Sequence, residues 1–273
     1  MDVEEHARAG TDVVDGLRGF AILVVVAYHL WLFSWYTPPP PADVFARTGY
    51  LGVDLFFLIS GFCLFFPYAR HVVEGTSRPT ARTFFYRRFL KIVPSYALAL
   101  VVTAALAAPT LARPSDAIGP FFTHAFFANN FFNDAFGKTN SVLWSLGIEV
   151  QFYLIFPLLA IVFMARPVLT AVAMIAIALV FRHATAGCCL AWETTIRQLP
   201  AFLDLFALGM FVAYAYVFAR ARLPWTRGAK IYFILAAMVL GLIAFAMLRG
   251  ANGVQYIPSG RETWNVDGRT LLG

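Results

Sequence analysis

Two basic side chains share one face of the first long apolar segment of the sequence, which runs from Leu17 to Tyr36. Arg18 and His29 are eleven residues apart, and in a helix eleven steps end about 20° past three full turns. The two groups are then about 16 Å apart along the helix axis. An ionisable side chain deep in such a segment is costly unless it is paired or hydrated. One helical face therefore carries both Arg18, which can bind an anion, and His29, which can transfer a proton.

A buried histidine also has a second interpretation, as a polar group that bridges two helices. The face that His29 shares with Arg18 favours the functional interpretation. Asp15, three residues before Arg18, can pair with the guanidinium and fix its orientation. We therefore predict His29 and Arg18 as catalytic residues, with Asp15 in support.

Four further polar side chains lie in later apolar segments. Asp54 lies near the outer end of GYLGVDLFFLISGF, where a capping role and a functional role are equally consistent with the sequence. Ser60 has no base beside it and is expected to pack helices rather than to act as a nucleophile. Glu149 lies well inside SVLWSLGIEVQFYLIFPLL, with Tyr153 one turn later. For Glu149 we favour a catalytic role over that of a helix-end carboxylate facing water, with Tyr153 in support.

One acidic residue in the sixth apolar segment has a simpler explanation. Asp204 follows Arg197 by two helical turns, a spacing that suits an ion pair within one helix. We expect this pair to be structural.

A run of cations follows the second apolar segment. The predicted loop from Arg70 to Lys91 contains Arg82 and ends in YRRFLKI, which adds Arg87 and Arg88. Basic clusters beside a membrane-spanning segment usually set topology or bind anionic lipid. They also offer several donors to the phosphates of a nucleotide-bearing substrate such as coenzyme A. We predict that Arg82, Arg87, Arg88 and Lys91 bind such a donor.

The composition excludes a soluble protein. Of the 273 residues, 60% are hydrophobic and 13% are charged, and the mean hydropathy is +0.70. Soluble domains are about 45–50% apolar and about 25% charged. The sequence predicts an all-α fold, a polytopic bundle of about seven membrane-spanning helices, at 17–36, 49–68, 92–112, 141–165, 168–181, 199–219 and 231–248.

The distribution of basic residues predicts the topology. With the N-terminus inside, more of the 21 Lys and Arg residues lie in inner segments than in outer ones, which favours a cytoplasmic N-terminus. This asymmetry explains why basic residues outnumber the 15 acidic ones, so the positive net charge does not require a nucleic acid partner. The three cysteines lie in apolar stretches without the spacing of a disulfide framework or a metal site.

The remaining segments complete the predicted organisation. Residues 1–16 form a polar N-terminal segment without the features of a signal peptide, and residues 17–248 form the transmembrane domain. The stretch from Phe121 to Phe136 is expected to be interfacial or re-entrant. The polar tail, residues 249–273, suggests that the chain is a fragment that leads to further spans.

Four segments of the sequence resemble motifs of the acyltransferase-3 family of integral membrane O-acyltransferases. They are DGLRGFAILVVVAYHL, GYLGVDLFFLISGFCL, RRFLKIVPSY and WSLGIEVQFYLIFPLL, and they occur in the family's order. The resemblance covers about residues 12 to 220 and implies a role for several of the residues named above.

By this resemblance, Arg18 and His29 fall on the family's Arg/His motif, with the histidine essential. Arg88 and Lys91 fall on its paired-arginine motif, which engages the acyl donor, and Glu149 falls on its intramembrane acid. Lys91 stands where the family usually has arginine, so the bidentate fork is lost at that position, with Arg87 in reach to compensate in part. Members of the family usually have more than seven spans.

The resemblance implies an enzyme of the bacterial inner membrane that moves an acyl group, expected to be acetyl, from acyl-CoA to a hydroxyl. The acceptor would be a glycan, a lipid-linked sugar or another envelope or secreted molecule. Acyl-CoA is a co-substrate, and no bound cofactor or metal is expected. Direct transfer and a relay through acylated His29 both remain open, as does the oligomeric state. The alternatives are a secondary transporter, although no inverted repeat is visible, and a non-catalytic membrane partner.

Overall fold

The computed structural model describes residues 2–34, 39, 46, 48–107, 115–132, 141–185, 197–222 and 238–239. Within these residues every regular element is a helix, which confirms the predicted all-α class. Helices keep every backbone hydrogen bond within one segment, as an apolar environment requires. The α-helices are α1 (Asp2–Phe33), α3 (Leu51–Glu74), α4 (Ala81–Ala107), α5 (Ser115–Ala125), α7 (Trp144–Ala165), α8 (Pro167–Thr185) and α10 (Leu203–Arg222). Four short 3-10 helices also occur: η1 (Thr48–Tyr50), η3 (Asn129–Phe131), η4 (Ser141–Leu143) and η5 (Leu199–Phe202).

Among the described residues, six helical segments are long and apolar enough to cross a membrane. They are Val13–Leu32, Leu51–Glu74, Ala81–Leu106, Trp144–Ala165, Pro167–Thr185 and Leu199–Arg222. They confirm the first six of the predicted spans. The seventh, at 231–248, lies outside the described residues apart from two positions, and the tail at 249–273 lies wholly outside them.

The predicted loop from Arg70 to Lys91 is wrong in its extent. The connection between α3 and α4 comprises only residues 75–80. Gly75 ends α3 with a φ of 70°, a left-handed conformation that glycine adopts without strain, and its N–H bonds to His71 O at 3.1 Å. The run YRRFLKI therefore belongs to α4, because Arg and Lys are good helix formers and can extend their charged ends towards water.

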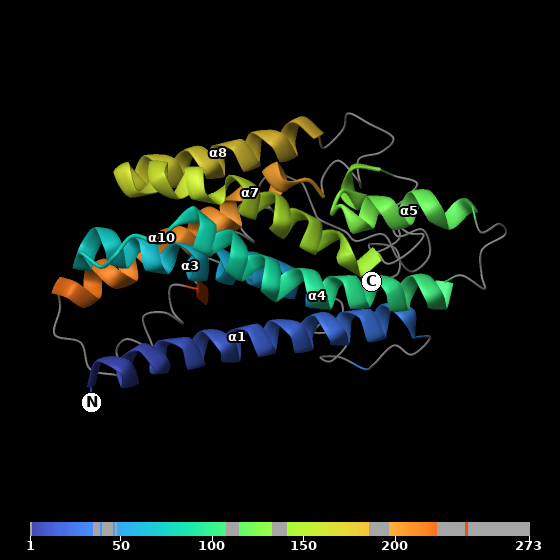
Figure 1. Cartoon of the computed structure of the whole chain (residues 1–273), viewed down its shortest axis with the longest axis horizontal. Coiled ribbons are helices and arrows are strands. Elements are labelled where there is room, and N and C mark those ends of the chain that lie inside the picture. The colour runs from blue at the N-terminus through green and yellow to red at the C-terminus, as the bar shows by residue number, and fades with distance from the viewer. Residues whose placement is uncertain are drawn as a thin grey trace.

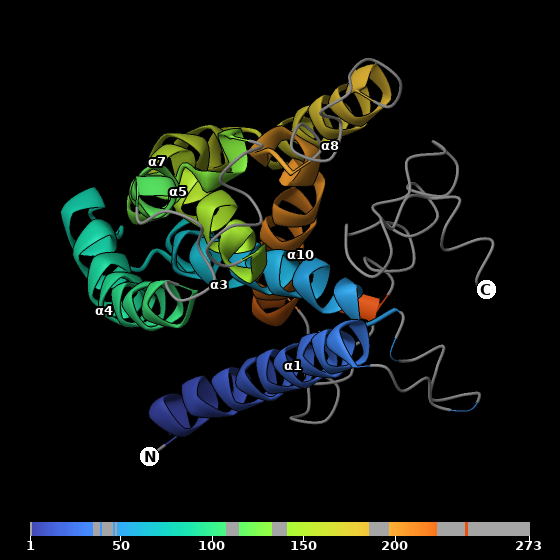
Figure 2. The same ribbon diagram turned by 90° about the vertical axis from the view of Figure 1, so that its right-hand side faces the viewer.

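Two helices form the centre of the bundle. Helices α3 and α10 cross so closely that a Cβ on Gly61 would lie 2.3 Å from Phe206 O, and one on Gly209 would lie 2.0 Å from Leu58 O. Glycine is required at both positions, because any side chain would push the two backbones apart. In Figures 1 and 2, α1 lies on one side of this pair and α7 and α8 lie on the other.

Helix α1 approaches the centre through a second glycine contact. A Cβ on Gly52 would lie 2.6 Å from Ala21 O, so α3 and α1 meet backbone to backbone. This contact fixes the rotation of α1 about its axis. It thereby determines which of its side chains face α3 and α7.

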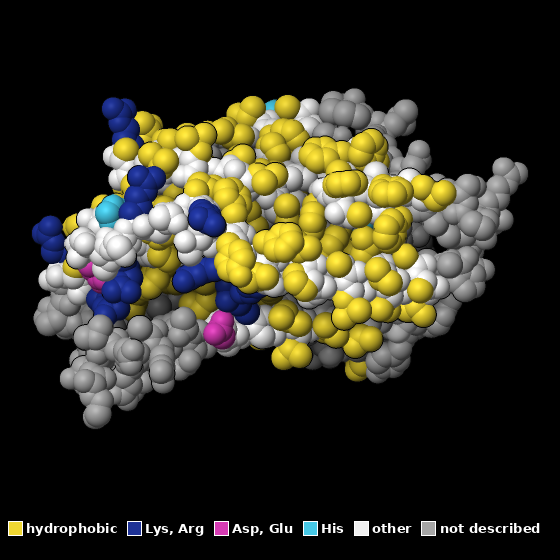
Figure 3. All heavy atoms as spheres, in the orientation of Figure 1, with side chains coloured by type: hydrophobic (Ala, Val, Ile, Leu, Met, Phe, Trp, Pro, Cys, Tyr) yellow, Lys and Arg dark blue, Asp and Glu magenta, His cyan; other side chains and the backbone are white. Residues whose placement is uncertain are grey.

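The charges gather at one end of the bundle. The N-terminus, the α3–α4 connection, the α7–α8 junction and the end of α10 lie at the same end in Figure 1. On the face shown in Figure 3, Lys and Arg cluster at that end, and hydrophobic side chains cover most of the described remainder. At 11 residues, α5 is too short to cross a bilayer, as expected for an interfacial segment.

Candidate active site

A buried carboxylate joins α3 to α7. Glu149 Oε1 accepts a hydrogen bond of 2.7 Å from Ser60 Oγ and a second bond from the hydroxyl of Tyr153. Glu149 is 9% exposed, and both donors are more deeply buried. Glu149 is therefore not a helix-end carboxylate facing water. Two hydroxyl donors hold it in one orientation, and Ser60 links helices as predicted.

A guanidinium stacks beside this carboxylate. Arg88 Cζ lies 5.5 Å from the ring centroid of Tyr153 and 5.8 Å from that of Phe84. Both distances fit a cation–π contact. Arg88 Nε is buried and has no hydrogen-bond partner among the described residues. Tyr153 thus contacts Glu149 through its hydroxyl and Arg88 through its ring.

Two more cations lie near Arg88. The charges of Arg18, Arg88 and Glu149 all act on Lys91, which places these groups in one neighbourhood. Arg18 Nη1 also pairs with Asp15 Oδ1 at 3.2 Å, as the sequence predicts. We call Arg18, Arg88 and Lys91 the cationic cluster. Its three positive charges face two negative ones, those of Asp15 and Glu149, so the cluster favours a further anion.

The other two predicted donor-binding residues differ in their position relative to this cluster. Arg82 and Lys91 are nine residues apart on α4, which is an odd number of half-turns, so they lie on opposite faces. Arg87 is exposed on α4, as Lys91 is, and lies about 40° from Lys91 around the helix, so it borders the cluster.

The geometry of His29 assigns its tautomer. His29 Nδ1 lies 2.8 Å from Val25 O, and a carbonyl oxygen can only accept, so Nδ1 carries the proton. In the neutral ring, Nε2 then carries the basic lone pair. The edge of the ring also packs against Tyr28, with centroids 5.2 Å apart. Glu149 bonds to Ser60 and Tyr153 rather than to His29, so the two predicted catalytic groups are not directly paired.

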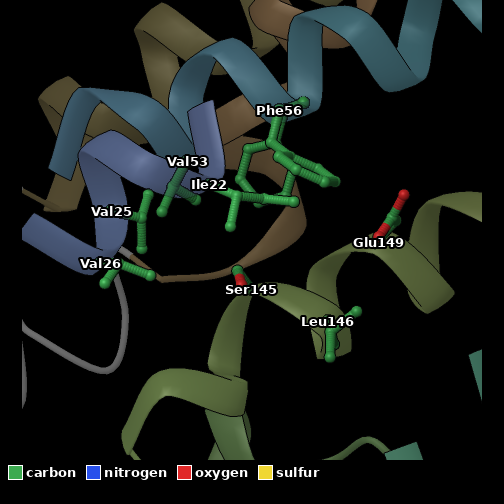
Figure 4. Close-up of a pocket in the computed structure, with 9 residues that line it drawn as sticks. Ile22, Val25, Val26, Val53, Phe56, Ser145, Leu146 and Glu149 are labelled. Atoms are coloured by element: carbon green, nitrogen blue, oxygen red, sulfur yellow. The ribbon is translucent and has the colours of Figure 1, made fainter. Parts of the chain in front are cut away.

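A cavity of about 210 Å³ lies between α1, α3 and α7, with Glu149 in its wall. Figure 4 shows Ser145 and Glu149 on α7 across from side chains of α1 and α3. The lining residues are Ile22, Val25, Val26, Val53, Phe56, Phe57, Ser145, Leu146 and Glu149.

The cavity lies beside one stripe of α1. Arg18, Ile22, Val25 and His29 follow at intervals of four, three and four residues, which places them on one helical face. Ile22 and Val25 line the cavity, with Arg18 before them and His29 after them. A cation, an apolar space, a carboxylate and a potential base therefore occur together. We take this arrangement as the candidate active site.

The prediction for Asp204 names the wrong partner. Asp204 Oδ2 pairs with Arg182 Nη2 at 2.7 Å, and the side chains are 0% and 1% exposed. Arg197 precedes the 3-10 turn that leads into α10, so the helical spacing on which the prediction relied does not apply. Arg197 Cζ lies instead 5.7 Å from the centroid of the Trp144 ring. An arginine inside a membrane span indicates a buried acidic partner. Arg182 was overlooked in the sequence because the predicted fifth span ended at residue 181.

Sequence reasoning also missed a buried amide network beyond the cavity. Asn130 Oδ1 accepts a bond of 3.0 Å from Gln151 Nε2, and Asn130 Nδ2 donates one of 3.0 Å to Arg197 O. The network fastens the segment after α5 to the N-terminal half of α7. The two adjacent asparagines, Asn129 and Asn130, in an apolar stretch were the sequence signal for this network.

The structure also locates Asp54, which was predicted to lie near the outer end of its span. Asp54 is 1% exposed and is thus buried in the bundle rather than facing water.

The described residues contain no group of three or more His, Cys, Asp or Glu side chains arranged for a metal ion. The groups around the cavity that can act on a substrate are the imidazole of His29, the carboxylate of Glu149 and the cationic cluster.

Comparison with known proteins identifies the family. A family model described as an acyltransferase domain matches residues 12–271. The peptidoglycan O-acetyltransferase OatA of Listeria monocytogenes is 32% identical over 174 residues, which are 58% of this chain and 25% of that protein. The O-acetyltransferase OatA of Staphylococcus aureus strain NCTC 8325 is 32% identical over 164 residues, or 53% of this chain and 24% of that protein. The chain thus spans about a quarter of the length of these relatives, and no solved structure matches it significantly. By the extent of the family match, the chain belongs to the acyltransferase-3 family.

Proposed function

We propose that the chain forms a membrane O-acyltransferase site that moves an acetyl group from acetyl-CoA to a hydroxyl of a cell-wall glycan. The observation that carries the proposal is the cavity beside Ile22 and Val25, the part of α1 between Arg18 and His29, with Glu149 in its wall. The relatives named as O-acetyltransferases support the acetyl group, and the one named for peptidoglycan supports the glycan acceptor.

The cationic cluster is the proposed docking site for the donor. Coenzyme A carries phosphates, and cations bind phosphate oxygens by charge-assisted hydrogen bonds. The buried Nε of Arg88 lacks a partner among the described residues, so an incoming anion would satisfy it. Arg82 is exposed on the face of α4 opposite Lys91 and would attract the donor from a distance rather than hold it, whereas Arg87, which borders Lys91, would add a phosphate contact. Acyl-CoA is made in the cytoplasm, so this end of the bundle, with the N-terminus, would face the cytoplasm.

His29 is the proposed general base. Its Nε2 takes the proton of the acceptor hydroxyl while the hydroxyl oxygen attacks the thioester carbonyl carbon. The carbon–sulfur bond breaks, the ester forms, and the thiolate of coenzyme A leaves with the proton returned from Nε2. Arg18 stabilises the negative charge that develops on the donor. A relay in which Nε2 itself attacks the carbonyl gives the same products through an acyl-imidazole.

Glu149 acts, in this proposal, on the cations rather than on His29. Its oxygen holds the Tyr153 hydroxyl, and the Tyr153 ring contacts Arg88. Glu149 therefore fixes the rotamer of the side chain on which Arg88 rests, and its charge partly neutralises the cationic cluster. This makes Glu149 a positioning residue for donor binding.

The test is transfer of labelled acetyl from acetyl-CoA into envelope glycans by membranes that contain the full chain. His29→Ala is compared with His183→Ala, which removes an exposed histidine from the last turn of α8. We expect label with wild type and with His183→Ala, and none with His29→Ala at equal protein level. Transfer that survives in His29→Ala would remove this residue from the mechanism. Absence of transfer in wild type would contradict the proposed donor or acceptor.

A further inference from the structure

We propose that the cavity between α1, α3 and α7 holds the acyl group of the donor, and that it admits acyl chains longer than acetyl. This inference rests on the proposed function and adds a substrate class to it. The residues that set the chain length would be Val26, Phe56 and Leu146, one from each of the three helices.

The lining of the cavity selects an apolar occupant. Seven of its nine residues are aliphatic or aromatic, and the polar exceptions are Ser145 and Glu149. Neither the phosphates of coenzyme A nor a sugar ring would find enough polar partners there. An acyl chain would gain free energy by leaving water, while its carbonyl could lie near the polar side.

The position of the cavity matches the position of the reacting carbon. Along α1, Ile22 lies about 6 Å beyond Arg18, and His29 lies about 6 Å beyond Val25. A donor whose phosphates rest on the cationic cluster would therefore extend its acyl end past Ile22 towards His29. The acyl group is the part of the donor that reaches this depth.

The size of the cavity exceeds what acetyl requires. An engineered apolar cavity of about 150 Å³ binds one molecule of benzene, which has six carbon atoms. On that scale, the 210 Å³ here has room for about eight carbon atoms. Acetyl has two, so the space would hold a butyryl or hexanoyl chain with the acceptor hydroxyl beside it.

A lipid tail is the competing occupant, because the cavity opens beside exposed parts of α1. Ile22 is 50% exposed and Val26 is 47% exposed. The occupant that we propose is the acyl chain, because the volume suits a short chain held whole, whereas a lipid tail would fit only in part. The carboxylate of Glu149 on the wall also disfavours a purely hydrocarbon occupant.

The test compares acetyl-, butyryl- and hexanoyl-CoA as donors with the same membranes, and it measures the ratio of label transferred. Val26→Phe narrows the cavity at a half-exposed position where a larger side chain can be accommodated. Leu23→Phe makes a similar enlargement on α1 at a residue that is 69% exposed and does not line the cavity. Phe56→Leu enlarges the cavity. The ratio of two donors within one sample is independent of the amount of folded protein.

We expect wild type to transfer butyryl at a rate within about tenfold of the rate for acetyl. Val26→Phe should lower the butyryl-to-acetyl ratio by about tenfold or more, since a group that no longer fits a pocket is discriminated by this order. Leu23→Phe should leave the ratio unchanged, and Phe56→Leu should raise the hexanoyl-to-acetyl ratio.

Three results would overturn the inference. Wild type that transfers acetyl but rejects butyryl would show that the cavity does not hold the acyl chain, and would leave the proposed function intact. Equal ratios in Val26→Phe and Leu23→Phe, or a Val26→Phe variant that slows all donors alike, would assign the cavity to another occupant such as a lipid tail. No transfer from any donor would overturn the proposed function and the inference with it.

Discussion

The hydroxyl of Ser60 donates a hydrogen bond of 2.7 Å to Glu149 Oε1, across the interface of α3 and α7. The two residues are 89 positions apart in the chain. This bond connects the central helix of the bundle to the wall of the cavity. It gives Ser60 a role in the site although Ser60 does not line the cavity itself.

Loss of this bond should weaken the site without unfolding the protein. Ser60→Ala leaves Tyr153 as the one donor to Glu149 in the described part of the chain, and a hydrogen bond to a charged group contributes about 1.5–3 kcal/mol. We expect acetyl transfer to fall by about tenfold or more in Ser60→Ala. Ser95→Ala is the matched control, since Ser95 is exposed and its hydroxyl bonds, among the described residues, to carbonyls of its own helix. Equal rates in the two variants would contradict the role of Ser60.

The cations of α4 should separate into two groups by their effect on the donor. Arg88→Ala removes a guanidinium that stacks on Tyr153, whereas Arg82→Ala removes an exposed one that lies about 120° away around α4 and opposite Lys91. We expect Arg88→Ala to raise the KM for acetyl-CoA by about tenfold, which corresponds to about 1.4 kcal/mol of donor binding. Arg82→Ala should change this KM by less than about twofold in physiological salt, because surface charges are screened there.

The comparison of these two variants also tests the family motif. If Arg82→Ala raised the KM as much as Arg88→Ala, general attraction to a basic surface would explain donor binding. The cationic cluster would then not be a specific phosphate site.

The sequence predicted the class of fold and most spans because apolar runs of about 20 residues have one stable form in a bilayer. It also placed Arg18 and His29 on one face, since both lie in a single unbroken helix whose periodicity is fixed. It could not pair Glu149 with Ser60, because that contact depends on how α3 and α7 pack. It paired Asp204 wrongly for the same reason: its partner, Arg182, lies on another helix, α8.

The buried pair of Arg182 and Asp204 should dominate stability. Asp204 also accepts a hydrogen bond from the N–H of Leu205, and Arg182 donates to Ala201 O, so the pair ties α8 to the start of α10. Removal of one partner leaves a buried charge, which costs about 3–5 kcal/mol. We expect Asp204→Asn or Arg182→Met alone to lower the temperature at which the detergent-solubilised protein aggregates.

The double variant, Arg182→Met with Asp204→Leu, should recover much of the lost stability, because no unpaired charge remains. The same double change made with Arg197→Met in place of Arg182→Met should not recover it. If stability recovered with Arg197→Met instead, the partner of Asp204 would be Arg197, as the sequence alone suggested.

Cys63 should report on the occupancy of the donor site. Val53, Phe56, Ser60 and Cys63 follow at intervals of three, four and three residues, so they lie on one face of α3. The first two line the cavity, Ser60 holds Glu149, and Cys63 lies within the electrostatic reach of Arg18, Arg88 and Lys91. A donor that spans the cationic cluster and the cavity must therefore pass close to the Cys63 thiol.

We expect acetyl-CoA to slow the alkylation of Cys63 by N-ethylmaleimide by about tenfold when the donor is at ten times its Kd, because about nine sites in ten are then occupied. The measurement uses a Cys188→Ser, Cys189→Ser background, so that Cys63 is the one cysteine of the chain, and it follows the label by mass spectrometry. Arg88→Ala should abolish the protection, and Arg82→Ala should preserve it. Alkylation at the same rate with and without acetyl-CoA, in protein that still transfers acetyl groups, would place the path of the donor away from this face of α3.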